Sequence, residues 1–143
     1  MEGHNAAAVW ARVRGQGEAA SLAETLPMMI SDELTERGTY LRLQRCAPVF
    51  RMLAREEGCH ARRLTALYFL LTGQEVCAET GALPHYASFA EALRDRFAQE
   101  LQSAKRYRTA AERWPEHGSL FRALAAQEQA HADRLHRLTQ TIL

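Results

Sequence analysis

The sequence predicts an all-α protein with four long helices arranged as two antiparallel helical hairpins. Glycine and proline fall at only a few places and leave four long segments between them. Within those segments apolar residues recur every three or four positions, as on one face of a helix, and no strand-like alternation competes. We expect an N-terminal segment over residues 1–25, with a short helix at 5–14, followed by one domain over residues 26–143.

The first predicted hairpin occupies residues 26–73. Pro27 suits the first turn of a helix that begins near Leu26 and runs to about Arg45. Pro48 can open the second helix, and Gly73 is a residue that commonly ends one. Residues 73–87 are then expected to form a loop.

The second predicted hairpin follows this loop. Ser88 and Glu91 have the spacing of a capping box, which predicts a third helix from there to about Trp114. The stretch "PEHGS" then predicts a turn, with Ser119 as the cap of a fourth helix that continues almost to the C-terminus.

Composition and charge exclude several classes of protein. The 143 residues are 47% hydrophobic and 24% charged, which is typical of a folded globular chain. A formal net charge of +1 gives no electrostatic reason to expect nucleic acid or an anionic membrane as a partner. No apolar run approaches the ~20 residues that span a bilayer, and the first 20 residues do not resemble a signal peptide. We therefore expect a cytoplasmic protein.

The cysteines agree with a reducing compartment. There are three, Cys46, Cys59 and Cys77, with no Cys-x-x-Cys pair. An odd number without such a pair argues against a disulfide framework, a zinc ribbon or a rubredoxin-type iron site. We expect all three to be small packing residues rather than reactive groups, although the sequence does not identify their role.

Two predicted helices place a glutamate and a histidine in the middle of an otherwise apolar stripe. The stripe of the second helix is Phe50, Leu53, Glu57, His60, Leu64, Leu67 and Leu71. That of the fourth helix is Phe121, Leu124, Glu128, His131, Leu135, Leu138 and Ile142. Because all other members are apolar, these polar residues are expected to face the core. A carboxylate in a dry core is costly unless it is paired or binds a metal.

The other two helices complete an internal repeat. Glu33 and Tyr40 lie seven positions apart on the first helix, as do Glu100 and Tyr107 on the third. The first half thus contains Glu33, Tyr40, Glu57 and His60, and the second Glu100, Tyr107, Glu128 and His131. Within each hairpin the two glutamates are about equally distant from the turn, so they should lie at one height.

One glutamate on a helix and Glu-x-x-His on the next, present twice, resembles the ferritin-like di-iron carboxylate proteins. The resemblance covers roughly residues 26–142. The phrases "LAREEGCHARRLTALYFLLTG" and "LFRALAAQEQAHADRLHRL" are most similar to the rubrerythrin family. The fold class expected is therefore an all-α, ferritin-like antiparallel four-helix bundle built from two helical hairpins.

The resemblance implies six ligands for two iron ions (Fe²⁺/Fe³⁺), or for manganese in their place. Glu57 and Glu128 would bridge the metals, Glu33 and Glu100 would be terminal carboxylates, and His60 and His131 would each bind one metal. Tyr40 and Tyr107 match tyrosines that hydrogen-bond the ligand carboxylates. No catalytic residue is expected beyond the ligands.

The resemblance further implies a non-heme di-iron oxidoreductase that reduces H₂O₂ or O₂ and takes part in the response to oxidative stress. The chain has no rubredoxin-like domain, so a separate electron donor such as a rubredoxin is expected, together with a homodimer. The glutamate that lets iron shift position in rubrerythrins has no obvious counterpart, because the neighbours of Glu100 are Phe97, Ser103 and Ala104. Peroxidase activity is therefore less strongly implied than metal binding.

Several alternatives remain open at this point. The protein could oxidise Fe²⁺ for storage or transfer, or it could be a non-catalytic metal-bound bundle. Glu36, one turn past Glu33, is the alternative ligand on the first helix, but the tyrosine spacing favours Glu33. We interpret His4, His85, His117 and His136 as solvated, along with the basic segments "ARRL", "RDRF" and "KRYR".

Overall fold

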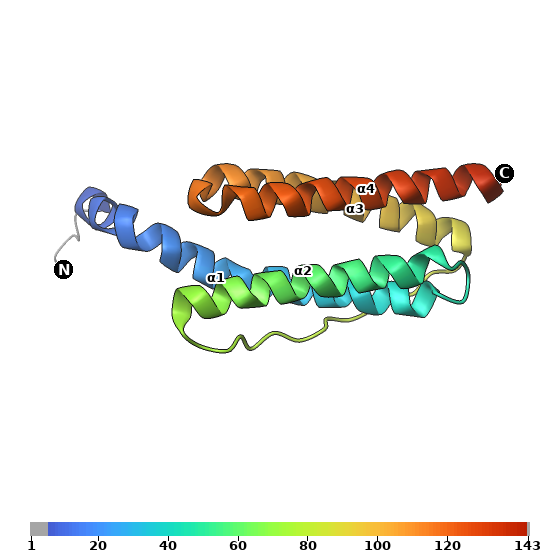
Figure 1. Cartoon of the computed structure of the whole chain (residues 1–143), viewed down its shortest axis with the longest axis horizontal. Helices are drawn as coiled ribbons and strands as arrows, with labels where there is room; N and C mark the ends of the chain where they lie inside the picture. The colour runs from blue at the N-terminus through green and yellow to red at the C-terminus, as the bar shows by residue number, and fades with distance from the viewer. Residues whose placement is uncertain (1–5, 143) are drawn as a thin grey trace. The chain divides into compact units, whose positions relative to one another are not determined.

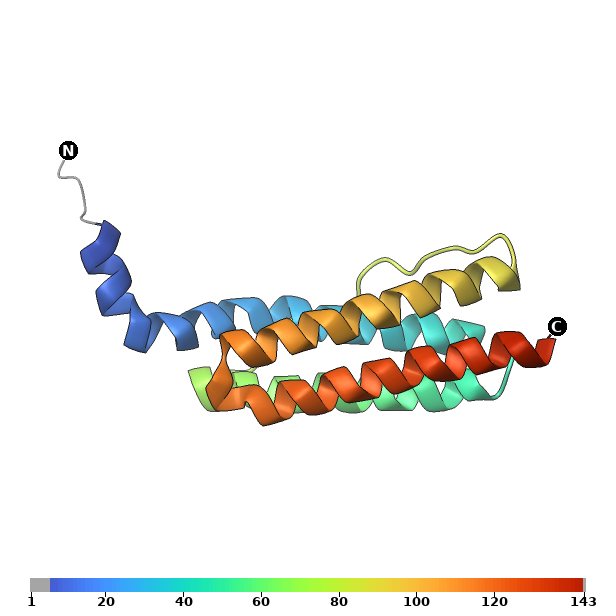
Figure 2. The same ribbon diagram turned by 90° about the horizontal axis from the view of Figure 1, so that it is seen from above.

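The computed structural model describes residues 6–142, with side chains from Leu22 onward. In this range the chain forms four α-helices and one 3₁₀ turn, with no strand. These are α1 (Ala6–Leu43), α2 (Val49–Thr72), α3 (Phe89–Arg113), the 3₁₀ turn η1 (Pro115–His117) and α4 (Gly118–Ile142). The chain divides into two compact units, residues 1–83 and 84–143. In the first, α1 packs on α2, and in the second, α3 packs on α4 (Figures 1 and 2).

The first unit contains the hairpin α1–α2. A short turn over residues 44–48 reverses the chain between the two helices. α2 ends as predicted, because Gly73 adopts the left-handed conformation (φ 69°) and donates its N–H to the Phe69 carbonyl at 2.7 Å. Only glycine adopts this conformation without steric cost, so a single residue type fixes the end of the helix.

The expected start of the first helix is wrong. α1 begins at Ala6 and contains Pro27 in its interior, so residues 6–14 belong to α1 and form no separate short helix. Residue 5 lies outside the described part. The alanine-rich stretch before Pro27 favours helix strongly. A proline removes one backbone hydrogen bond, and a long helix can continue past it. The change of direction that Figure 2 shows in α1 lies in its dark-blue N-terminal part, before Pro27.

The loop after α2 is irregular, as predicted, and lies along α1 (Figure 1). Two hydrogen bonds attach it there. The Ser31 hydroxyl donates to the Glu79 carbonyl at 2.5 Å, and the Gly81 N–H donates to Thr35 Oγ1 at 2.7 Å. These hydrogen bonds satisfy backbone groups of the loop that would otherwise need water as their partner.

The second unit contains the hairpin α3–α4, and its predicted capping box is present. Ser88 Oγ accepts a hydrogen bond from the Glu91 N–H at 3.1 Å. The Glu91 carboxylate in turn accepts from the Ala87 N–H at 2.7 Å, one residue before the cap. Both bonds satisfy amides at the start of α3 that have no partner within a helix.

The predicted cap of the fourth helix is wrong by a short distance. α4 begins at Gly118, so Ser119 lies inside the helix. The turn η1 leads directly into α4, and the Gly118 N–H bonds to the Pro115 carbonyl. The first amides of a helix have no partner within the helix. A 3₁₀ turn before the helix supplies carbonyl acceptors for them, so a serine side chain is not needed as the acceptor.

The apolar stripes predicted for α2 and α4 form the core over most of their length. Their phenylalanines and the central leucines are at most 7% exposed. The stripe of α4 ends earlier than expected, because Ile142 in the last turn is 54% exposed. The packing role predicted for the cysteines is wrong for Cys46 and Cys77, which are exposed because a turn and a loop carry them.

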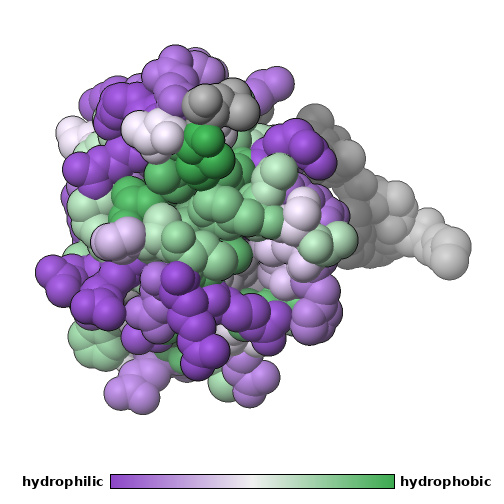
Figure 3. All heavy atoms as spheres, turned by 90° about the vertical axis from the view of Figure 1, so that its right-hand side faces the viewer, coloured by the Kyte–Doolittle hydropathy of each residue, from purple (hydrophilic) through white to green (hydrophobic). Residues whose placement is uncertain are grey.

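The outer surface is mixed in character. Both hydrophilic and hydrophobic residues are exposed on the surface that Figure 3 shows. Large apolar side chains that are exposed include Met28, Phe69 and Leu70. None of the described helices is long and apolar enough to span a membrane.

Candidate metal centre

The first hairpin brings its three predicted ligands together. Glu33 lies on α1, and Glu57 and His60 lie on α2, one helical turn apart. His60 Nδ1 is 3.4 Å from Glu33 Oε2 and 3.4 Å from Glu57 Oε2. One ligand atom from each residue lies within 4.8 Å of the others. Their exposed fractions are 2%, 0% and 0%, so the three groups converge in a buried position.

The second hairpin repeats this arrangement. Glu100 lies on α3, and Glu128 and His131 lie on α4. His131 Nδ1 is 3.5 Å from Glu100 Oε2, and one ligand atom from each residue again lies within 4.8 Å of the others. All three are at most 1% exposed. The expectation that each hairpin places its glutamates at one height is met, since the histidine of one helix reaches the glutamate of the other.

An aromatic pair lies two helical turns from the ligands in each hairpin. The Tyr40 ring stacks on Phe50 with centroids 5.8 Å apart, and Tyr107 stacks on Phe121 at 6.2 Å. All four rings are at most 1% exposed. Each pair joins the two helices of its hairpin between the ligands and the turn, and so fixes their separation near the site. The predicted hydrogen bonds from the tyrosines to ligand carboxylates stay a prediction.

Residues interpreted as solvated are mostly confirmed as such. His85 and His136 are exposed, His117 is half-buried, and His4 lies outside the described residues. Glu36, the alternative ligand on α1, is half-buried, whereas Glu33 is 2% exposed and lies beside His60. The geometry within the first hairpin therefore favours Glu33.

One buried charge near the site was not foreseen. The segment "RDRF" was interpreted as a solvated face, but Arg96 is only 5% exposed. Its Nε donates to the Tyr86 hydroxyl at 3.0 Å and its Nη2 to Asp95 Oδ2 at 3.0 Å, and Tyr86 donates to Asp95 Oδ2 at 2.5 Å. Arg96 lies one turn before Glu100, next to the apolar stripe. This position is the one feature of the sequence that could have indicated its burial.

The same network shifts two pKa values in opposite directions. Burial, reinforced by the hydrogen bond to Asp95, raises the pKa of Tyr86 to about 12. Burial alone would raise the pKa of Asp95, but the hydrogen bonds from Tyr86 and Arg96 lower it below its ordinary value. Tyr86 therefore keeps its proton and Asp95 its charge, which is the ionisation state in which all three groups are paired.

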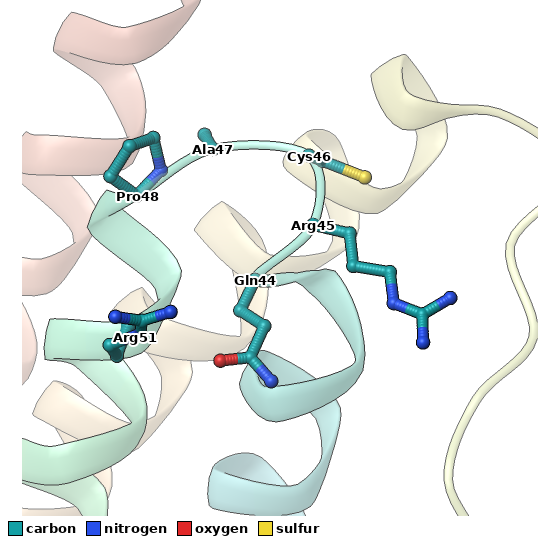
Figure 4. Close-up of a pocket in the computed structure, with 6 residues that line it drawn as sticks. All are labelled: Gln44, Arg45, Cys46, Ala47, Pro48 and Arg51. Carbon is teal, nitrogen blue, oxygen red and sulfur yellow. The ribbon is translucent and has the colours of Figure 1, made fainter.

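Two surface hollows of the first unit are lined by residues other than the predicted ligands. One, of about 450 Å³, follows the α1–α2 turn and is lined by Gln44, Arg45, Cys46, Ala47, Pro48 and Arg51. Cys46 and Arg45 point to the same side of this turn, away from Pro48 (Figure 4). A second, of about 370 Å³, lies between α1, α2 and the loop around Val76. Neither is lined by a predicted ligand.

The donor set in each hairpin is suited to a metal ion. Two carboxylates and one imidazole form a hard, oxygen-rich set of the kind that iron and manganese prefer, and thiolates are absent from it. Buried carboxylates are costly without a compensating charge. The structure thus shows buried carboxylate and histidine groups that could hold a metal.

Comparison with known families agrees with this geometry. The family model described as Rubrerythrin matches residues 20–138. That domain is a ferritin-like di-iron domain, so the predicted fold class is confirmed by the match and by the four helices. No curated protein and no solved structure matched the chain.

Proposed function

The chain belongs to the rubrerythrin family, and we propose that it reduces H₂O₂ or O₂ at a di-iron centre. The proposed ligands are Glu33, Glu57, His60, Glu100, Glu128 and His131. The observation that carries this proposal is the repetition of one buried donor set, with a histidine nitrogen 3.4–3.5 Å from a carboxylate of the neighbouring helix in each hairpin. One such set is weak evidence for a metal, but two related by an internal repeat are strong evidence.

We assign the roles by chemistry and by family. Glu57 and Glu128 would bridge the two metals, Glu33 and Glu100 would each complete one side, and each histidine would bind one ion. Four carboxylates carry −4, which balances the +4 of two ferrous ions in a core where net charge is costly. Two adjacent irons supply the two electrons that cleavage of an O–O bond requires.

The chain itself contributes position and exclusion of water. The four carboxylates and two histidines are at most 2% exposed, so an oxidant would react away from bulk solvent. The hydroxyls of Tyr40 and Tyr107 are proposed to orient ligand carboxylates, because groups outside the ligand set commonly fix the direction in which a ligand points. Their stacking on Phe50 and Phe121 limits the movement of the rings.

Oxidation of Fe²⁺ for iron handling is the second candidate. No carboxylate lies one turn before or after Glu100, where Phe97, Ser103 and Ala104 stand. A rubrerythrin-like peroxidase uses an additional glutamate there, so its absence favours a simpler ferroxidase cycle. A separate electron donor such as a rubredoxin, a homodimer and a cytoplasmic location stay predictions.

Metal content and the optical spectrum after aerobic oxidation are the first test. We expect two irons per chain and the absorption of oxygen-bridged ferric ions. Glu33→Ala should lose metal, and Glu36→Ala is its matched control and should retain both ions. Protein that takes up no Fe²⁺ would contradict the proposal, and a Glu36→Ala variant that alone loses iron would move the ligand to Glu36.

Turnover separates the two candidate reactions. Iron-loaded protein should consume H₂O₂ repeatedly when a chemical reductant is added, and the rate should fall in Glu57→Ala. Rapid oxidation of added Fe²⁺ with little peroxide turnover, together with a large shell on size-exclusion chromatography, would instead establish the ferroxidase.

A further inference from the structure

Three buried aromatic rings form a row in the second hairpin. Tyr107 on α3 stacks on Phe121 of α4, with centroids 6.2 Å apart and planes 17° from parallel. Trp114, at the end of α3, lies against the same Phe121 ring at 6.1 Å and 43°. The three residues are at most 5% exposed. Ring contacts thus continue without a break from Tyr107 to Trp114.

The row extends from near the ligands to the end of the hairpin. Tyr107 follows Glu100 by seven residues, and Trp114 follows Tyr107 by another seven, which is about 10 Å per step along a helix. Trp114 immediately precedes the turn η1. The guanidinium carbon of the exposed Arg113 lies 4.8 Å from the centre of the Trp114 ring. The outer end of the row therefore touches a side chain in solvent.

The first hairpin has the inner part of this row but no tryptophan at the position that corresponds to Trp114. Its Tyr40–Phe50 pair corresponds to Tyr107–Phe121. The position that corresponds to Trp114 is Ala47, 67 residues earlier, as Tyr40 is to Tyr107. A tyrosine–phenylalanine pair is thus sufficient to close a hairpin of this kind, and the tryptophan is an addition found in one half.

The chemistry of the two end residues suggests a use for the row. Apart from thiols, the phenol of tyrosine and the indole of tryptophan are the side chains that give up a single electron most readily. The phenyl ring of Phe121 does not give up an electron and serves as a contact between Tyr107 and Trp114. We propose that Tyr107 and Trp114 form an electron path between solvent at the α3–α4 turn and the metal centre. The proposal rests on the proposed function, because it needs an oxidised centre inside and a one-electron reductant outside.

Electrons and protons balance along the path. Tyr107 gives one electron to the centre after oxidation by H₂O₂ or O₂, and Trp114 then gives one electron to oxidised Tyr107. A soluble one-electron donor finally reduces Trp114. On oxidation Tyr107 passes its O–H proton to the ligand carboxylate that its hydroxyl is proposed to orient, and Trp114, at the end of the hairpin, releases its N–H proton to water. Each ring regains a proton when it is reduced, so the protein returns to its starting state. The Arg113 cation makes electron loss from the indole harder, which favours the oxidised form on Tyr107, nearer the ligands.

Metal-free protein allows the path to be tested without the metal centre. In a Trp10→Phe background, azide radicals generated by pulse radiolysis should oxidise Trp114. The absorption of the indolyl radical should then decay as that of a phenoxyl radical grows, at a rate independent of protein concentration. Tyr107→Phe should abolish this growth. The matched control Tyr40→Phe removes the corresponding ring of the first hairpin and should leave it intact.

Iron-loaded protein shows whether the path serves the centre. After H₂O₂ without reductant, peptide mapping should find oxidation at Trp114 and Tyr107. Trp114→Phe should slow reduction by an added one-electron donor while the iron content stays unchanged. Phenoxyl growth that survives Tyr107→Phe would overturn the proposal, as would an unchanged reduction rate in Trp114→Phe. A protein that binds no iron but passes the metal-free test would refute the proposed function and the metal centre as the end of the path, whereas electron transfer between Trp114 and Tyr107 would stand.

Discussion

The two hairpins carry the same proposed ligand residues and differ at their ends. Glu33 and Glu100 correspond across the repeat, as do the Glu-x-x-His pairs and the tyrosine–phenylalanine stacks. Beyond the stack, the first hairpin turns through Ala47 and Pro48, whereas the second places Trp114 and η1 there. One turn before the α3 ligand, the buried Met29 of the first half is replaced by the buried Arg96.

This difference separates the residues that the proposed metal binding would require from those that it would leave free to vary. The shared residues lie at the ligands or within two turns of them, where a shift of a carboxylate would change the coordination. The residues that differ can make other contacts, such as those of Arg96 with Tyr86 and Asp95. Equivalence at the ligands and divergence elsewhere can be tested by making the same change in each half.

The largest expected effect is loss of both metals. Glu57→Ala and Glu128→Ala should each abolish binding of two ions, because each removes a carboxylate proposed to bridge them. Metal analysis after anaerobic loading with Fe²⁺ measures this. If one variant keeps an ion and the other loses both, the two halves are not equivalent at the ligands.

Phe50→Ala and Phe121→Ala should come next. Both phenylalanines are 0% exposed, and such truncations typically cost about 3–5 kcal/mol. Phe121→Ala also removes the contact with Trp114, whose position is Ala47 in the first hairpin, so the second variant should be the less stable. Urea denaturation of metal-free protein gives the comparison. An equal or larger cost for Phe50→Ala would show that Trp114 adds nothing to the packing.

Metal should stabilise the protein by a similar or smaller amount. Binding to the folded state alone contributes about 3–4 kcal/mol when free metal exceeds its Kd by roughly 100- to 1,000-fold. Anaerobic thermal melts with and without Fe²⁺ should show the gain, and it should increase from about pH 5 to about pH 7.5 because metal displaces protons from its ligands. A melting temperature indifferent to Fe²⁺ and Mn²⁺ over that range would leave a plain helical bundle.

The smallest effect concerns the network that only the second hairpin has. The folded-state pKa of Tyr86 is about 12, above its ordinary value of 10.0, so its contribution to stability is complete below pH 10 and is lost as the pH rises through 12. In Tyr86→Phe the melting temperature should fall less steeply with pH in this window. Arg96→Met, which copies the first hairpin, is the companion variant. A decline in Tyr86→Phe as steep as in the parent would assign the alkaline transition to another group.

Local patterns predicted most of the fold. Gly73 and the Ser88–Glu91 capping box act within a few residues, and they fixed helix ends correctly. The repeated spacing of Glu33, Glu57 and His60 brought ligands together within each hairpin because the helices pair around a short turn. The sequence alone therefore predicted a buried group of carboxylates and histidines that could hold a metal.

The failures had two physical sources. Pro27 indicated the start of a helix, but α1 already begins at Ala6. The helix propensity of the residues before Pro27 offsets the loss of one backbone hydrogen bond. The burial of Arg96 depends on Tyr86, which reaches it from the preceding loop, ten positions away. No periodicity encodes such a partner. The same holds for Cys46 and Cys77, whose exposure follows from the turn and the loop that carry them.

The pairing of each helix with the next one in the chain also bears on how quickly the protein folds. α1 finds α2 across a five-residue turn, and α3 finds α4 across residues 114–117. Most contacts within a hairpin therefore close small loops, and chains of low contact order typically fold in microseconds to milliseconds. Each set of three proposed ligands can come together as soon as the two helices of its own hairpin pair, before contacts between distant parts of the chain have formed.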